Sequence, residues 1–171
     1  LFRQVLQEVD SVRDSNATIL LTGESGTGKE MVARAIHKHG SRADKPFVAV
    51  NCAAIPENLL ESELFGYVGG SFTGARKEGK AGLFEMAHNG TIFLDEINSM
   101  APSIQSKLLR VLETKQVMRL GSDYVIPLDI RIISASNADI MELFYNDKHL
   151  QVTFEKDTTE SQEEALVEIY K

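Results

Sequence analysis

Two glycines and a lysine in the stretch GESGTGKE, residues 23–30, have the spacing of a loop that binds phosphate. Backbone N–H groups between Gly23 and Lys29 can wrap phosphate oxygens, because glycine leaves room for a close approach and adopts dihedral angles closed to other residues. Lys29 would add a positive charge for the outer phosphates. Glu30 stands where such loops carry the Ser or Thr that reaches Mg²⁺. The stretch by itself therefore leaves open a plain glycine-rich turn.

A second pair of candidate residues, Asp95 and Glu96, follows the apolar run TIFL at 91–94. In open α/β sheets, ligands bind outside the carboxyl ends of the strands. There Asp95 would hold Mg²⁺, and Glu96 would orient the water that attacks the γ-phosphate. An acidic turn that caps the next helix is the alternative for an isolated Asp-Glu pair. A phosphate loop upstream makes the catalytic interpretation the stronger one.

Asn51 and Asn137 stand at or just beyond the ends of two further apolar runs. An amide at position 137 could hold the attacking water or an oxygen of the γ-phosphate. Alone, either asparagine is more often a turn residue. Polar groups at four strand ends nevertheless favour one shared site over four unrelated turns.

The elements that must position these residues are short. Near-continuous apolar runs are typical of parallel strands buried on both faces, and they cover residues 17–22, 47–50, 91–94 and 130–135. The predicted helices are residues 102–113 and residues 28–39, the latter with an apolar face of Met31, Val32, Ala35 and Ile36. Because strand and helix alternate, we expect an α/β fold with a mainly parallel sheet.

The chain ends in an acidic, polar stretch, residues 151–171. Residues 150–154 could form a fifth strand. The stretch Ser161-Gln162-Glu163-Glu164 reads as a capping box. It predicts a short helix that would carry Leu166, Ile169 and Tyr170.

Charge and cysteine content restrict the possible functions. The 171 residues have a formal net charge of −7, which disfavours direct binding of DNA by this chain. No apolar run is long enough to span a bilayer, so no membrane association is expected. The single cysteine, Cys52, follows a strand and is expected to be a buried structural thiol. The lack of any possible intrachain disulfide fits a cytoplasmic protein.

Several stretches together resemble the central AAA+ ATPase domain of bacterial enhancer-binding proteins, the activators of sigma-54 RNA polymerase. They are GESGTGKEMVARAIH, PFVAVNCAAIPENLLESELFG, GSFTGA, TIFLDEI, IQSKLLRVLE and IRIISASN. The resemblance implies a P-loop NTPase (AAA+) fold, a three-layer αβα sandwich with a mainly parallel sheet. It also implies that glutamate at position 30 is the family form of the loop. We expect a nucleotide-binding α/β core over residues 1–144 and a divergent tail over residues 145–171.

The resemblance assigns roles around ATP or ADP and Mg²⁺. The phosphate loop, the Walker A motif of the family, is Gly23, Glu24, Ser25, Gly26, Thr27, Gly28, Lys29 and Glu30. Asp95 matches the metal-binding acid and Glu96 the catalytic acid. Asn51 matches the residue that switches this glutamate, and Asn137 matches the first sensor position.

The family resemblance also assigns a partner. The segment Gly70, Ser71, Phe72, Thr73, Gly74 and Ala75 matches the loop that projects from a hexameric ring and contacts sigma-54. Its glycines would let the backbone reshape with nucleotide state, and Phe72 and Thr73 would form the contact. Without the resemblance, a turn that tucks Phe72 into the core would be preferred.

The sequence departs from the family pattern in two places. Ser71 replaces the usual alanine, and Tyr67-Val68-Gly69 stands where a charged pair is usual, which should alter how the loop docks on its own domain. After Arg131 the chain has no arginine, so no residue matches the family's arginine fingers, and no lid sequence is present.

We therefore leave two functions open. The first is the ATP-dependent activator domain, coupling ATP binding and hydrolysis to remodelling of sigma-54 RNA polymerase. The second is a non-hydrolysing nucleotide-binding or interaction module. Whether the chain is an enzyme stays open, because a missing arginine finger would slow phosphoryl transfer by a factor of about 10³–10⁵. The GSFTGA stretch argues against an unrelated P-loop remodelling protein.

Overall fold

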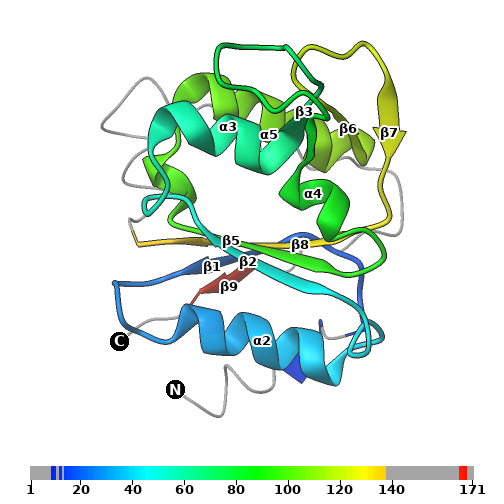
Figure 1. Ribbon diagram of the computed structural model, residues 1–171. Coiled ribbons are helices and arrows are strands. Elements are labelled where there is room, and N and C mark those ends of the chain that lie inside the picture. Colours follow the sequence, from blue (N-terminus) through cyan, green and yellow to red (C-terminus); the bar gives the residue numbers. More distant parts are fainter. Residues whose placement is uncertain (1–8, 11, 13, 138–165, 169–171) are drawn as a thin grey trace.

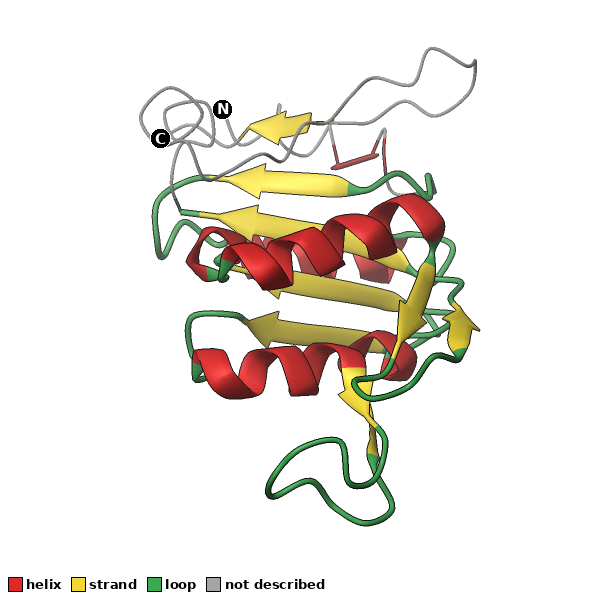
Figure 2. Cartoon of the chain, turned by 90° about the horizontal axis from the view of Figure 1, so that it is seen from above, coloured by secondary structure: helices red, strands yellow, loops and turns green. Residues whose placement is uncertain are grey.

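The structure is a computed structural model, and it describes residues 9, 10, 12, 14–137 and 166–168. A parallel five-stranded sheet crosses the molecule in the order β2-β5-β8-β1-β9 (Figure 1). The strands are β1 (Ile19–Thr22), β2 (Phe47–Asn51), β5 (Thr91–Asp95), β8 (Arg131–Ser136) and β9 (Leu166–Glu168). Every strand pair in this sheet is parallel, so the carboxyl ends all lie at one edge (Figure 2).

Helices cover both faces of the sheet, which confirms the predicted three-layer αβα arrangement (Figure 1). Helix α2 (Lys29–His39) lies on one face, and α3 (Glu57–Phe65), α4 (Leu83–Met86) and α5 (Pro102–Thr114) lie on the other. Strand β5 shows why its sequence is a continuous apolar run. Ile92 and Leu94 belong to the core under α3 and α5, whereas Phe93 belongs to the core under α2. A strand covered on both sides has no face for polar residues.

The buried face of α2 differs from the predicted one. Ala33, Ile36 and the aliphatic stem of Lys29 are buried, whereas Met31 is 76% exposed. Lys29, Ala33 and Ile36 follow each other at helical spacings of four and three residues, so they form one stripe. The phosphate loop directs Lys29 inward, and this sets the phase of the whole helix and turns Met31 to solvent.

Two small hairpins and a 3-10 helix were not predicted from the sequence. Strand β3 (Gly66–Tyr67) pairs with β4 (Lys80–Ala81), and β6 (Gln116–Met118) pairs with β7 (Val125–Pro127). The hairpins meet where Leu120 donates its N–H to Gly66 O at 2.9 Å and accepts from Val68 N at 3.1 Å. The 3-10 helix η1 (Ile97–Ser99) directly follows the acidic pair.

The end of the chain corrects one prediction. Leu166–Glu168 form strand β9, which pairs with β1 in parallel, so the predicted helix is wrong over these residues. The capping-box pattern reports local preference only, whereas the outer edge of β1 offers unpaired N–H and C=O groups to a neighbouring strand. The strand predicted over 150–154 lies outside the described residues. No helix among the described residues combines the length and apolarity that crossing a lipid bilayer requires.

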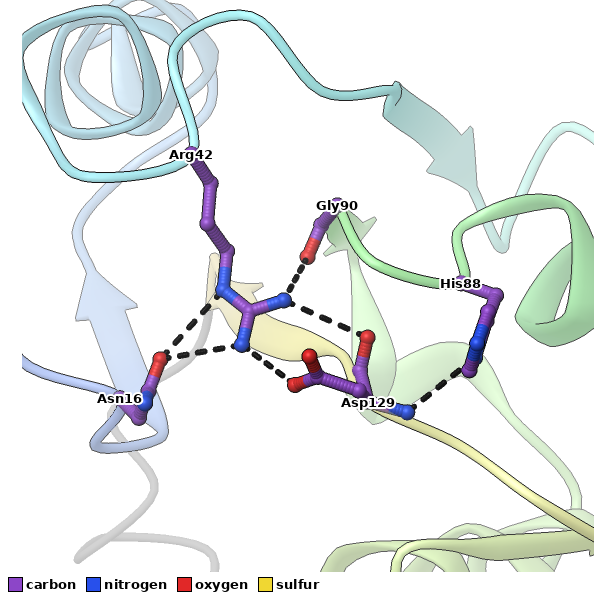
Figure 3. A network of polar contacts seen from close by, with 5 residues as sticks. All are labelled: Asn16, Arg42, His88, Gly90 and Asp129. Carbon is purple, nitrogen blue, oxygen red and sulfur yellow. Dashed lines mark hydrogen bonds and ion pairs between the residues drawn. The ribbon is translucent and has the colours of Figure 1, made fainter.

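Arg42 connects the amino ends of the strands, at the opposite edge of the sheet, through hydrogen bonds (Figure 3). Its guanidinium donates to Asn16 Oδ1 at 3.2 Å, before β1, and to Gly90 O at 3.4 Å, before β5. It also donates to Asp129, before β8, through the carbonyl at 3.3 Å and the carboxylate at 2.5 Å. His88 accepts the Asp129 N–H at 3.2 Å. One side chain therefore fixes the starts of three neighbouring strands.

Replacing Arg42 by alanine is expected to lower the free energy of unfolding by about 2–3 kcal/mol. The side chain is 14% exposed, and its loss would leave the Gly90 and Asp129 carbonyls without this donor. The free energy of unfolding of Arg42→Lys should lie between those of the wild type and Arg42→Ala. An ammonium keeps the positive charge but lacks the planar set of donors of a guanidinium. Urea unfolding followed by circular dichroism measures the change. The exposed Arg110→Ala is the control, and equal losses in both variants would contradict the role of Arg42.

Candidate functional site

The loop from Gly23 to Gly28 connects β1 to α2 and has the backbone of an anion cradle. Gly26 and Gly28 lie in the left-handed region with φ of 82° and 88°, which favours glycine. A Cβ added at either position would meet nothing within 4 Å. Backbone conformation, and not crowding, therefore demands glycine, and the outer side of the loop is open to a ligand.

Lys29 closes this loop on itself. It is 6% exposed, and its ammonium donates to Gly23 O at 2.7 Å and to Glu24 O at 2.9 Å. An ammonium has three donors, and these carbonyls take two of them. The charge is thus held at the amino end of α2, where the helix dipole adds to the attraction for an anion.

The remaining residues of the loop shape it or face outward. Thr27 donates its Oγ1–H to Glu24 O at 2.8 Å, which tightens the turn, and Ser25 is exposed. Glu30 is also exposed, and its Oε1 accepts from Arg34 Nε at 2.9 Å and Nη2 at 2.7 Å. The glutamate therefore lies on the solvent side of α2 and does not stand in for the hydroxyl that other phosphate loops carry.

Strand β5 delivers Asp95 and Glu96 to the same edge of the sheet. Asp95 Oδ1 accepts the N–H of Glu96 at 3.0 Å. Glu96 has φ of 55°, a left-handed conformation that costs a residue with a side chain about 1–3 kcal/mol and concentrates at functional sites. Ser99 holds this turn, because its hydroxyl donates to Glu96 O at 2.7 Å.

The loop and the acids lie on either side of strand β8. Gly23 donates its N–H to Ser136 O at 3.2 Å, and Asn137 Nδ2 lies 3.5 Å from Glu96 Oε1. Strands β1 and β5 flank β8, so their ends are about 10 Å apart at the usual strand spacing. The structure thus brings the phosphate loop, the acidic pair and Asn137 to the same edge of the sheet, on neighbouring strands.

The two predicted asparagines occupy different places at this edge. Asn51 pairs in register with Asp95, but its Oδ1 accepts the N–H groups of Ala53 at 3.0 Å and Ala54 at 3.1 Å. Its side chain thus caps the turn after β2. The carboxylate of Glu96 meets Asn137 instead.

Three residues near the acids lacked a sequence signal for this site. Asn98 contacts Asn137, and Ser136 contacts Asn98; a single asparagine or serine after a strand is too common to single out. Cys52 is buried as predicted and donates its N–H to Asp95 O at 3.0 Å. Burial and the charges of Asp95 and Glu96 raise the pKa of the Cys52 thiol to about 12, so it is no nucleophile.

The Gly70–Ala75 loop connects β3 to β4 and projects from the α3 side of the molecule (Figures 1 and 2). Phe72 is 41% exposed, so it is not a core residue, and its ring meets the edge of Tyr67 with centroids 5.0 Å apart. Ser71 donates its hydroxyl to Val68 O at 2.7 Å. Tyr67, Val68 and Ser71 thus shape the base of the loop.

Two glycines, one in the stem of this loop and one in the neighbouring hairpin, leave no room for a side chain. A Cβ at Gly69 would lie 2.0 Å from Lys77 O, where the two arms of the stem approach each other. A Cβ at Gly121, on the turn between β6 and β7, would lie 2.7 Å from Ser71 Cβ. The second hairpin therefore rests directly against the loop.

Comparisons with known proteins agree with this architecture. The profile of the family described as "Sigma-54 interaction domain" matches residues 1–156. UacR of Escherichia coli strain K12, named as a sigma-54-dependent transcriptional regulator, is 49% identical over 154 residues, 90% of this chain and 26% of that protein. A Nif-specific regulatory protein of Bradyrhizobium diazoefficiens is 53% identical over 138 residues, 81% of this chain and 24% of that protein.

A solved structure gives the same result. The crystal structure of NtrX from Brucella abortus matches with a TM-score of 0.77 and 40% identity, covering 84% of this chain and 32% of that one. This chain spans about a quarter of the length of the curated relatives it matches. The family profile covers most of the chain, so the chain belongs to the sigma-54 interaction domain family and has its P-loop NTPase fold.

Proposed function

We propose that this chain binds ATP or ADP with Mg²⁺ at the carboxyl edge of the sheet, between the phosphate loop and the Asp95–Glu96 pair. The observation that carries the proposal is the arrangement around β8, where Gly23 bonds to Ser136 on one side and Asn137 reaches Glu96 on the other. NtrX structures in complex with ADP and with ATP match this chain with TM-scores of 0.75 and 0.74, which supports a nucleotide in the corresponding place.

The residues present fit a magnesium nucleotide. The open side of Gly26 and Gly28 leaves the cradle free of side chains, and Lys29 offers its charge at the helix end. Among the described residues, no group of three or more His, Cys, Asp or Glu side chains could hold a metal by itself. Mg²⁺ commonly takes one or two carboxylates together with phosphate oxygens and water, so Asp95 and a bound nucleotide would complete such a site.

The chain's own residues then have separate tasks. The loop amides of residues 23–30 and Lys29 would bind the phosphates, and Asp95 would hold the metal. Glu96 would orient and polarise the attacking water, with Asn137 beside it to hold that water or a phosphate oxygen. Asn51 would act as the switch of Glu96 only by leaving its present bonds to the turn after β2.

We further propose that the Gly70–Ala75 loop contacts sigma-54 RNA polymerase in a nucleotide-dependent manner, within a hexamer-type ring in the cytoplasm. The half-exposed Phe72 and the positive φ angles of Gly70 and Gly74, 76° and 93°, suit a loop that changes shape. The net charge of −7 argues against direct DNA binding by this chain.

A second candidate is a module that binds nucleotide without turning it over. It is favoured by one feature of the sequence, the lack of any arginine after Arg131 that could act as a finger. For this chain alone we expect slow hydrolysis, since an arginine finger contributes a factor of about 10³–10⁵. Calorimetric titration with Mg-ADP or Mg-ATP tests the binding common to both candidates. We expect measurable heat and a thermal shift, and their absence would contradict the proposed site.

Replacing Thr73 by alanine is expected to weaken capture of sigma-54 by about tenfold or more, because loss of the hydroxyl would leave its hydrogen-bonding partner in the interface unpaired. Nucleotide affinity should stay unchanged, since the loop lies away from the phosphate cradle. A pull-down with purified sigma-54 and a transition-state analogue of ATP measures capture. The exposed Thr114→Ala is the matched control. Equal capture by wild type and Thr73→Ala would reject the role of the loop.

A further inference from the structure

A chain of side-chain hydrogen bonds ends on the carboxylate of Glu96. Ser136 Oγ donates to Asn98 Oδ1 at 3.2 Å, and Asn98 Nδ2 donates to Asn137 Oδ1 at 3.0 Å. Asn137 Nδ2 in turn faces Glu96 Oε1 at 3.5 Å. We call these residues the asparagine relay. No motif of the sequence includes Asn98, and the roles proposed above do not use it.

The negative charge at one end fixes the direction of every group in the relay. A carboxylate accepts hydrogen bonds only, so Asn137 must turn Nδ2 toward Glu96 and Oδ1 away from it. Oδ1 then needs a donor, which is Asn98 Nδ2, and this turns Asn98 Oδ1 toward the Ser136 hydroxyl. Each group therefore donates to the next one in the direction of the Glu96 carboxylate.

The far end of the relay is anchored in rigid structure. Ser136 is buried at the end of β8, pairs in register with Thr22 of β1, and its carbonyl accepts the N–H of Gly23. Asn98 lies on η1, in the turn that the left-handed Glu96 begins. The relay thus connects the start of the phosphate loop with Glu96 along the carboxyl edge of the sheet.

On the basis of the proposed function, we propose that Asn98 is a positioning residue, whose amide orients Asn137 and through it the carboxylate of Glu96 for the attack of water. Without Asn98 the Oδ1 of Asn137 loses its donor, and only the contact with Glu96 holds the amide. The exposed Asn137 side chain can then leave its present direction, and Glu96 loses the donor that orients its carboxylate.

Asn98→Asp tests this directly, because it keeps the size of the side chain and its acceptor for Ser136. The introduced carboxylate cannot donate to Asn137 Oδ1, and it competes with Glu96 for the Nδ2 donors of Asn137. Asn98→Ala removes the contact without adding charge. Asn58→Asp is the matched control, because it introduces the same charge at an exposed position on α3.

The first measurement is single-turnover hydrolysis of ATP by the whole chain, with nucleotide affinity determined in parallel. Asn98→Asp is expected to lower the rate constant about 10- to 100-fold, as loss of a supporting outer residue commonly does. Affinity should stay within about twofold, because the phosphate cradle is intact. In an Asn137→Ala background the same substitution should have almost no further effect, because its target is gone.

The second measurement needs no nucleotide. In protein with isotope-labelled asparagine, the side-chain amide signal of Asn137, assigned by its loss in Asn137→Ala, should shift in Asn98→Asp and stay in place in Asn58→Asp. An unshifted signal would overturn the relay. Hydrolysis at the wild-type rate in Asn98→Asp would overturn the positioning role while leaving the proposed function intact. Lack of nucleotide binding in the wild type would instead contradict the proposed function. The amide signal of Asn137 would still test the relay, because it is measured without nucleotide.

Discussion

Substituting Lys29 by methionine is expected to weaken the binding of Mg-ADP and Mg-ATP by about 100-fold or more. Methionine keeps most of the buried aliphatic stem but removes the ammonium. The charge aimed at the outer phosphates is then lost, together with the bonds to Gly23 O and Glu24 O that close the loop. A hydrogen bond from the ammonium to a phosphate oxygen would contribute about 1.5–3 kcal/mol, and one or two such bonds account for the expected loss.

Isothermal titration calorimetry of the whole chain measures this change. Lys38→Met is the matched control, because Lys38 is exposed in the last turn of the same helix. Far-ultraviolet circular dichroism of both variants checks that α2 still forms. Equal dissociation constants for Lys29→Met and Lys38→Met would show that the loop is a turn and not a phosphate cradle.

Glu96→Gln is expected to lower the rate of ATP hydrolysis about 100-fold or more, while ATP binding is retained. Glutamine has the shape of glutamate and still presents an oxygen to Asn137 Nδ2, so the position of the side chain is conserved. It cannot take a proton from the attacking water, which removes general-base assistance. The loss should fall on the rate constant and leave the dissociation constant for ATP unchanged.

Slow turnover requires single-turnover conditions with protein in excess and phosphate release followed over hours. Glu113→Gln, an exposed acid on α5, is the control for the change in charge. A Glu96→Gln variant that hydrolyses ATP as fast as Glu113→Gln would exclude Glu96 as the group that activates water. Another group near the phosphate loop would then have to activate the water.

The two substitutions test residues on opposite sides of strand β8. Lys29 belongs to the loop after β1, and Glu96 follows β5, with β8 between them. Loss of binding in one variant and loss of turnover in the other would separate the phosphate cradle from the chemical step. The same separation could not arise from a general loss of folding, which would reduce both quantities in both variants.

The sequence by itself determined the parts of this site that depend on local rules. The strands before Gly23 and Asp95 are apolar on both faces because helices cover both faces of the sheet, and such runs are visible without any structure. Gly26 and Gly28 were identifiable because left-handed backbone restricts a position to glycine. The end of α2 at His39 agrees with the helix predicted over residues 28–39.

Only the tertiary structure decided which of these groups meet. Asn51 and Asn137 looked alike in sequence, yet Asn137 faces Glu96 while Asn51 caps its own turn. Likewise, the local pattern around Leu166 favoured a helix, but the open edge of β1 made it a strand. Asn98 carried no signal at all before its contact with Asn137 was visible. The reason is physical: propensities and spacings act between near neighbours in the chain, whereas register across a sheet and the direction of a side chain depend on residues far away in sequence.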